Sequence, residues 1–306
     1  MKENEFNLTH SKKYNVQLLG GNDTITLFHQ SDGIRGDAAW FSLLNDAGVK
    51  QHDSIVQKSA AGLVYSLHSA RPGRYRLQVL QQNSPQDKMY VGWLGNIGVI
   101  IGRDRRVTFE KSPVMDNNVD LYGHLKDDWK TLEAYKVLPA GNNKAIIQKT
   151  YEIIRGCFTD YNKVMAIHDW IAQNIYYDMD SYLSGRIDYS KLGDSSKVFE
   201  NRLAVCAGYS DLAVVMLRAI GIPAVTQSCF ALGMSTSGYW TDQNIKHESN
   251  HAITRAYVQK RWILMDTTWD SHNEYKNATF QKNGQITHQY FDPTIQSLSN
   301  THKLCG

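Results

Sequence analysis

The sequence AVCAGYSDLAVVMLRAIGIPA, residues 204–224, decides the fold of the second half of the chain. Its apolar residues recur at nearly helical spacing, which predicts a helix with one buried face. That face carries Val205, Leu212, Met216 and Ala219. Gly221 and Pro223 mark the end of the helix. Cys206 therefore stands in the first turn of a largely buried helix.

A cysteine at this position can serve catalysis. The N–H groups of a first helical turn have no acceptor within the helix, and with the helix dipole they stabilise a thiolate. We therefore expect the pKa of Cys206 to be lowered. A thiolate is the reactive form, and a neighbouring N–H can hold a developing oxyanion. The alternative is a buried structural cysteine, because free cysteines are among the most buried residues.

Length and composition limit the class of protein. At 306 residues, two domains are expected. A hydrophobic share of 42% and a charged share of 21% are ordinary for a globular protein. The net charge is +3 without a basic run, so nucleic acid is not an expected partner. No apolar run reaches the roughly 18 residues that span a bilayer, so no membrane span is expected.

The four cysteines are Cys157, Cys206, Cys229 and Cys305. They form no C-x-x-C pair, which disfavours a zinc ribbon or a thioredoxin-like motif. Bridges between Cys157 and Cys229 or between Cys229 and Cys305 stay open. Residues 1–13 are polar, which predicts a poorly ordered tail without the apolar segment of a signal peptide. Such a start would suit a chain whose signal has been removed, and we expect an extracellular or cell-surface protein.

Residues 14–112 show short alternating runs separated by turn residues, which predicts an all-β sandwich or small barrel. The expected strands include residues 24–29, 63–67, 75–80, 89–94, 98–101 and 106–109. Turn signals lie at residues 20–23, 31–33 and 72–73. The sequence ARPGRYRLQV, residues 70–79, resembles a late strand of an immunoglobulin-like sandwich. No catalytic grouping is visible, so this is a binding, spacer or structural module.

Residues 113–141 are a mixed connector, and the period changes to 3.6 near Asn142, a plausible helix cap. One helix carries Ile146, Thr150, Ile153 and Ile154 on one face and stops at Gly156. A second is expected over residues 163–177, with His168 on its apolar face as a core-edge histidine. Residues 182–199 are polar and irregular and could cover a cleft.

Strands are expected after the Cys206 helix, at residues 224–232, 250–257 and 261–266, with a loop over residues 233–249. Helices followed by strands favour an α+β domain with an antiparallel sheet, which we assign to residues 142–306.

Three residues needed for thiol catalysis occur in order: Cys206, His251 and Asp266. The imidazole takes the thiol proton and later gives it to the leaving group, while the carboxylate orients the imidazole and stabilises its charged form. Two antiparallel strands joined by a turn can set His251 beside Asp266. Alternatively, His251 is a buried strand residue and Asp266 caps the turn after it. A zinc site of all three is also conceivable, although the spacing matches no zinc pattern.

Four motifs carry a family resemblance: AVCAGYS, LRAIGIPA, NHAIT and WILMDTTWD. In this order they resemble the transglutaminase-like superfamily of papain-related thiol enzymes, most closely bacterial members of the VCxGYA type. The tail HQYFDPTIQSLSNTHK is similar to the segment after the aspartate in those proteins. The resemblance covers residues 142–306, roughly half the chain.

The resemblance implies that Cys206 is the nucleophile, His251 the general base and Asp266 the orienting acid. The Cys206 N–H would serve the oxyanion hole. Two departures matter: Ala204 replaces the usual glycine, and Ile253 stands where the family often has tryptophan, which changes the acceptor side of the cleft.

Other site residues are implied by the same resemblance. The second oxyanion donor stays open among Gln173, Asn174 and Tyr177. Tyr177, Tyr209 and Trp269 are the expected substrate-binding residues, with core packing as the alternative for Trp269.

The implied activity is acyl transfer through a thioester on Cys206. Water as acceptor gives a peptidase or amidase, and a lysine amine gives a transamidase. Extracellular protein or cell-wall peptide is the expected substrate. No calcium-loop pattern is present, so no metal or cofactor is expected. Two rivals stay open: a catalytically silent member that binds or scaffolds, and a surface adhesion module.

Overall fold

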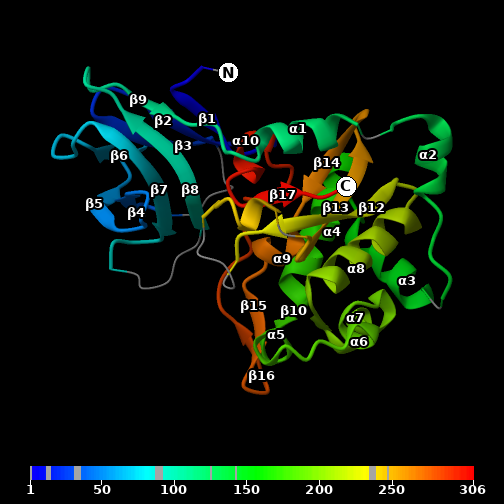
Figure 1. Cartoon of the computed structure of the whole chain (residues 1–306). Coiled ribbons are helices and arrows are strands. Elements are labelled where there is room, and N and C mark those ends of the chain that lie inside the picture. The colour runs from blue at the N-terminus through cyan, green and yellow to red at the C-terminus, as the bar shows by residue number, and fades with distance from the viewer. Residues whose placement is uncertain are drawn as a thin grey trace.

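The computed structural model describes residues 2–11, 15–30, 36–86, 92–124, 126–141, 143–233, 239–246 and 248–306. Two halves lie side by side, a β-sandwich and a mixed half of helices and sheets (Figure 1). The α+β organisation expected from sequence is present. Several expected features lie outside the described residues: the turn at residues 31–33, the start of the strand at residues 89–94, the Asn142 cap, and part of the loop at residues 233–249.

Two antiparallel sheets form the first half. One has the order β1-β2-β3-β6 and the other the order β5-β4-β7-β8-β9. The strands of the first sheet are β1 (Glu5–Asn7), β2 (Asn15–Gly20), β3 (Thr24–Gln30) and β6 (Leu63–Ser66). Those of the second are β4 (Ala38–Leu44), β5 (Lys50–Gln57), β7 (Gly73–Gln82), β8 (Gly92–Ile101) and β9 (Val107–Phe109).

The sandwich is held by one apolar core between its sheets. Phe41 of β4 stacks on Tyr65 of β6 with ring centroids 4.9 Å apart, and both side chains are fully buried. β4 and β5 cross to the second sheet before β6 returns to β3. Such crossovers are typical of Greek-key sandwiches, immunoglobulin-like ones included. The immunoglobulin-like assignment remains a prediction, which this strand order favours.

The expected disordered tail is wrong for part of residues 1–13. Glu5–Asn7 form β1, which pairs with β2, and Phe6 is fully buried against Phe109. One aromatic residue in a polar stretch suffices, because burying a phenylalanine outweighs the ordering of a short strand on an existing sheet edge.

The second half is built around α8 (Cys206–Ala219). Its main sheet has the order β14-β13-β12-β17 and is antiparallel throughout, as expected. The strands are β12 (Ala224–Ala231), β13 (His251–Val258), β14 (Arg261–Met265) and β17 (His302–Leu304). A smaller sheet, β11-β10-β15-β16, includes two parallel pairs that the sequence did not indicate. Its strands are β10 (Tyr176–Asp178), β11 (Leu203–Ala204), β15 (Asn273–Lys276) and β16 (Thr279–Lys282).

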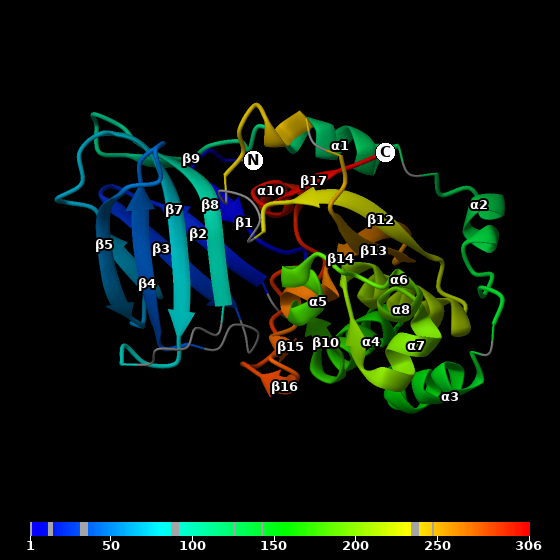
Figure 2. The same ribbon diagram turned by 60° about the horizontal axis from the view of Figure 1, so that its bottom comes forward.

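Helices surround the main sheet (Figure 2). They are α1 (Met115–Gly123), α2 (Trp129–Ala134), α3 (Lys144–Ile153), α4 (Asp160–Asn174), α5 (Met179–Ser184), α6 (Tyr189–Leu192), α7 (Ser195–Asn201), α9 (Thr267–Asp270) and α10 (Ile295–Leu298), with a 3₁₀ turn at Asn244–Lys246. The core of this half joins α4, α8 and one face of the sheet. Leu121 and Tyr122 of α1 cover a smaller apolar cluster that includes Ile253 and Leu264.

Two expected elements differ. The helix expected over residues 163–177 ends at Asn174, and Tyr177 lies on β10. Residues 182–199, expected to be irregular, include the end of α5, all of α6 and most of α7. Each of these three helices begins at an aspartate whose side chain accepts a backbone N–H: Asp178, Asp188 and Asp194. Such caps nucleate short helices that carry little apolar pattern.

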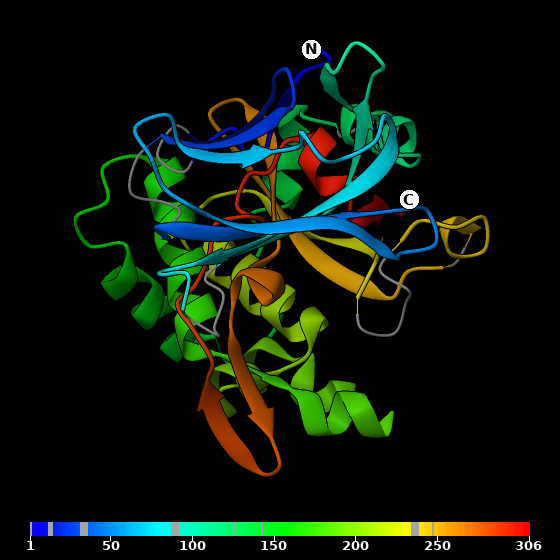
Figure 3. The same cartoon turned by 90° about the vertical axis from the view of Figure 1, so that its left-hand side faces the viewer.

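The sandwich contacts the second half of the chain directly, and Figure 3 shows the molecule from the sandwich side. Thr294 donates its N–H to Leu8 O, and Asn96 Nδ2 donates to Asn300 O over 2.8 Å. The Arg76 guanidinium stacks on the Tyr239 ring at 3.6 Å. The first two contacts seat the sandwich on the segment between α9 and β17, and the third joins it to the segment between β12 and β13.

Candidate active site

Cys206 is the first residue of α8, as the sequence predicts. β11 precedes it, and Val205 is the N-cap residue in extended conformation. Gly208 allows the close approach of α6, because a Cβ there would lie 2.1 Å from the Leu192 carbonyl oxygen. That carbonyl also accepts the Val205 N–H over 3.1 Å. The first turn of α8 is thereby fixed between α6 and β11.

His251 begins β13, opposite Cys229 of β12. Its Nε2 lies 2.8 Å from Oδ2 of Asp266, so the N–H at Nε2 donates to the carboxylate. Burial lowers the pKa of His251, but the charge and the hydrogen bond of Asp266 and the contact with Cys206 raise it to about 10. The structure therefore favours a protonated imidazole, and Nδ1 is the nitrogen left for Cys206.

Asp266 comes directly after β14, and it is buried. Its Oδ1 accepts the N–H groups of Thr268 and Trp269, so it is also the N-cap of α9, which was the alternative interpretation from sequence. Burial raises the pKa of this carboxyl, but the charge and hydrogen bond of His251 hold it well below its ordinary value. The β13–β14 hairpin thus brings the histidine and the aspartate together as expected.

The Cys206 thiol lies beside His251 and the backbone N–H of Ala252, and both act on its ionisation. Burial alone raises the pKa of Cys206, but the contact with His251 and the Ala252 N–H bring it below its ordinary value. A lowered thiol pKa beside a raised imidazole pKa is the signature of a thiolate–imidazolium pair. The structure brings all three residues of the predicted triad into one connected group.

His302 of β17 is part of the same group, although it is not among the site residues expected from sequence. Its Nε2 lies 3.1 Å from Oδ2 of Asp266, the oxygen that His251 also contacts. The signal available was a histidine in the tail motif that carried the family resemblance. No local pattern could pair residues so far apart in the chain.

The three expected substrate-binding residues have different surroundings. Trp269 is partly exposed on α9 and packs against His251, with ring centroids 5.8 Å apart. Tyr177 is half-buried on β10. Burial raises the pKa of its hydroxyl most, and the nearby Cys206 thiolate raises it further. Tyr209 is fully buried, and its hydroxyl donates to Ile175 O over 2.9 Å. The substrate-binding prediction for Tyr209 is therefore wrong, and the residue belongs to the core.

The two departures from the family pattern are both buried. Ala204 is fully buried on β11, and Ile253 is packed in the apolar cluster beneath α1. Ile253 therefore does not line an open cleft. All four cysteines are free thiols, so neither bridge left open by the sequence is formed.

Two groups in the described part of the chain bring metal-ligating atoms within 4.8 Å of one another. One is His251, Asp266 and His302, and the other is His168, Asp169 and His288. In both groups an aspartate oxygen accepts from the two histidines. Hydrogen bonds thus account for each arrangement.

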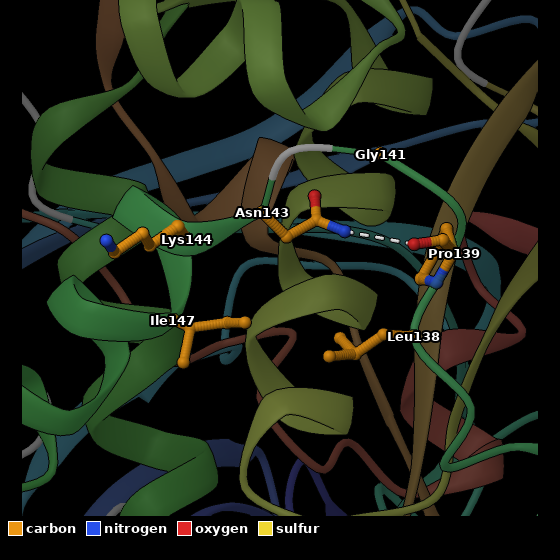
Figure 4. A pocket seen from close by; sticks show the side chains of 6 residues that line it. All are labelled: Leu138, Pro139, Gly141, Asn143, Lys144 and Ile147. Atoms are coloured by element: carbon orange, nitrogen blue, oxygen red, sulfur yellow. Dashed lines mark hydrogen bonds between the residues drawn. The ribbon is translucent and has the colours of Figure 1, made fainter.

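A surface pocket lies where the connector meets α3 (Figure 4). It is lined by Leu138, Pro139, Gly141, Asn143, Lys144 and Ile147. Asn143 Nδ2 donates to Pro139 O over 3.0 Å across its rim. The neighbouring Val137 carbonyl accepts from Arg218, near the end of α8 opposite Cys206. This pocket is therefore separate from the candidate active site.

Comparison with known families agrees with this geometry. A family model described as the transglutaminase-like superfamily matches residues 147–267. These residues form a transglutaminase-like core. The matched range includes Cys206, His251 and Asp266. It confirms the transglutaminase-like core expected from sequence, while the bacterial subtype stays a prediction.

The transglutaminase-like core also has curated relatives. Kyphoscoliosis peptidase of Mus musculus and its counterpart in Homo sapiens are each 30% identical to this chain over 120 residues. The match covers 39% of this chain but 17% of each relative.

Among solved structures, the periplasmic domain of TgpA from Pseudomonas aeruginosa aligns over 85% of this chain and 89% of that chain, at 13% identity and a TM-score of 0.36. Red sea bream transglutaminase aligns over 80% of this chain and 48% of that chain, at 14% identity and a TM-score of 0.33.

No helix in the described residues is long and apolar enough to cross a membrane.

Proposed function

We propose that this chain is a thiol acyl-transfer enzyme that forms a thioester on Cys206 from a protein or peptide amide. The observation that carries the proposal is the connected group of Cys206, His251 and Asp266, with Cys206 at the start of α8. The family match and the word peptidase in the names of the curated relatives support it.

The first half-reaction uses a proton already in place. The Cys206 thiolate attacks the amide carbon, and a carbon–sulfur bond forms while the carbonyl oxygen becomes an oxyanion. In this mechanism the Cys206 N–H donates to this oxygen, with Tyr177 as the candidate second donor. The carbon–nitrogen bond then breaks, and the proton on His251 goes to the departing amine. The thioester and a neutral His251 remain.

The second half-reaction releases the acyl group. His251 takes a proton from water or from a primary amine, which attacks the thioester carbon. The carbon–sulfur bond breaks and Cys206 leaves as a thiolate beside the protonated imidazole. Water gives a carboxylic acid, and an amine gives a new amide. Asp266 stabilises the charged imidazole throughout.

The test is intact mass spectrometry after incubation with a glutamine-containing protein and a primary-amine probe. Probe incorporation that is lost in Cys206→Ala would establish transamidation, and cleavage or deamidation lost in that variant would establish hydrolysis. Cys157→Ala is the matched control, because Cys157 lies between α3 and α4, outside the triad. If wild type gives none of these products on a panel of proteins and wall peptides and Cys206 reacts no faster than Cys157, the enzyme proposal fails.

A further inference from the structure

Asp266 Oδ2 is shared by two histidines. His251 Nε2 lies 2.8 Å from it and His302 Nε2 lies 3.1 Å from it. A carboxylate only accepts hydrogen bonds, so Nε2 of His251 and Nε2 of His302 each carry a proton. The second histidine is fully buried on β17, far along the chain from the β13–β14 hairpin. The proposed triad thus has a fourth member that holds its aspartate from the other side.

The other ring nitrogen of His302 is also occupied. Nδ1 lies 2.9 Å from Oγ1 of Thr301, which lies 3.2 Å from the hydroxyl of Tyr290. All three side chains are buried. A neutral His302 with its proton on Nε2 must accept at Nδ1, and the Thr301 hydroxyl can donate there while accepting from Tyr290. The chain of donors therefore runs from Tyr290 through Thr301 and His302 to Asp266.

The surroundings of His302, burial above all, favour its neutral form. Asp266 contacts it directly, Asp270 acts on it from α9, and the His251 imidazolium acts on it from β13. Burial lowers the pKa of His302 most strongly, the two aspartates oppose this, and the charge on His251 lowers it further. The Trp269 ring packs against the His302 ring with centroids 4.5 Å apart, and the His302 side chain is fully buried. One carboxylate therefore faces one charged and one neutral imidazole.

We propose that His302 is a positioning residue that donates its Nε2 proton to Asp266 and so keeps Oδ2 aimed at His251. The proposal rests on the proposed function, since it concerns the same triad. Oδ1 of Asp266 is committed to the first turn of α9. Without a second donor, Oδ2 would be held by His251 alone, and rotation of the carboxylate would let the imidazole leave the line to Cys206. His302 fixes that rotation without adding a second positive charge.

The test compares His302→Phe with His302→Gln. Phenylalanine keeps a ring but has no donor, whereas the glutamine amide can donate from about the position of Nε2. The measurement is the rate of Cys206 alkylation by iodoacetamide across pH, read by mass spectrometry, with Cys157 as internal reference. We expect His302→Phe to raise the apparent pKa of Cys206 by about one unit, which slows alkylation about tenfold below that pKa. His302→Gln should stay within about twofold of wild type.

A folded His302→Phe with an unchanged pH profile would overturn the proposal, and so would an equal loss in both variants. If His302→Phe does not fold, Thr301→Val against Thr301→Ser takes its place, because valine removes the hydroxyl that fixes Nδ1 while serine keeps it. We expect Thr301→Val, but not Thr301→Ser, to raise the apparent pKa of Cys206 in the same way. Equal alkylation profiles for the two variants would overturn the proposal.

Alkylation needs no substrate. A wild type without turnover would defeat the proposed function while the His302-dependent shift still stood. Turnover in wild type without the shift would defeat only the inference. With a substrate in hand, His302→Phe should lower kcat and leave KM nearly unchanged, because His302 acts on the triad through Asp266.

Discussion

Nε2 of His168 on α4 lies 3.1 Å from Oδ2 of Asp270 on α9, and both side chains are fully buried. The other ring nitrogen of His168 lies 3.0 Å from Oδ1 of Asp169. Burial lowers the pKa of His168, but hydrogen bonds to the two carboxylates raise it to about 9. Because Asp266 is the N-cap of α9, this buried pair ties α4 to the turn that carries the triad aspartate.

Asp270→Asn should therefore lower the free energy of unfolding by about 3 kcal/mol, since it leaves a buried histidine with one charged partner instead of two. The measurement is urea unfolding near neutral pH, in a double-mutant cycle with His168→Phe. A coupling energy above about 1 kcal/mol is expected for the pair. Coupling near zero would show that the contact contributes no stability.

The pair also gives a pH dependence. The pKa of His168 is raised from 6.5 to about 9 by folding, so its contribution to stability is fully present below about pH 6.5 and is lost as pH rises through about 9. The difference in unfolding free energy between wild type and the double variant should shrink over that interval.

His168 shows what the sequence could predict. Its place on an apolar helical stripe correctly indicated a buried residue, because periodicity reports which face is covered. Its partner Asp270 lies in a different element, and nothing local joins them. The same holds for His302 and Asp266, which meet only when β17 pairs with β12.

The β13–β14 hairpin was predictable because its two strands are close in sequence. β13 and β14 are neighbours in sequence, and the turn between them uses Gln259 and Lys260 with φ of 53° and 60°. Local pairing therefore placed His251 beside Asp266. Short helices over residues 182–199 were missed because polar caps rather than an apolar stripe start them.

Cys206 should be alkylated fastest among the four thiols at neutral pH. The pKa of Cys206 is lowered and that of His251 is raised to about 10. The thiolate–imidazolium pair therefore exists at pH values between these two pKa values. The alkylation rate should rise through a first inflection below the ordinary thiol pKa. A second inflection is expected near pH 10, where His251 loses its proton and the thiolate becomes a stronger nucleophile.

Asp266→Asn provides the check on this assignment. Asparagine can still cap α9 but lacks the charge, so the pKa of His251 should fall and the second inflection should move to lower pH. A second inflection that does not move would mean that another group causes it.

Changing Tyr177 or Tyr209 to phenylalanine should affect different properties: turnover for Tyr177 and stability for Tyr209. Tyr209→Phe leaves the buried Ile175 carbonyl without its donor, which should cost about 1 kcal/mol of stability with turnover unchanged. Tyr177 pairs with Ala204 on the strand that leads to Cys206. If its hydroxyl reaches the oxyanion, Tyr177→Phe should lower kcat by about 10²-fold with little change in stability. Equal kcat for the two variants would remove Tyr177 from the oxyanion hole.

The N-terminal strand should contribute to stability despite its polar sequence. Phe6 is fully buried with its ring 5.7 Å from that of Phe109, so Phe6→Ala should lower the free energy of unfolding by about 3–5 kcal/mol. Lys2→Ala, at an exposed position, is the control and should change it by less than about 0.5 kcal/mol.

The same strand reaches toward the site. Thr294, the N-cap of α10, donates its hydroxyl to Asn7 O and its N–H to Leu8 O, and α10 leads to His302. These backbone acceptors survive in Phe6→Ala, so the alkylation profile of Cys206 should match wild type while the protein is folded. A loss of thiolate reactivity well below the unfolding transition would instead show that Phe6 holds the β17 segment against Asp266.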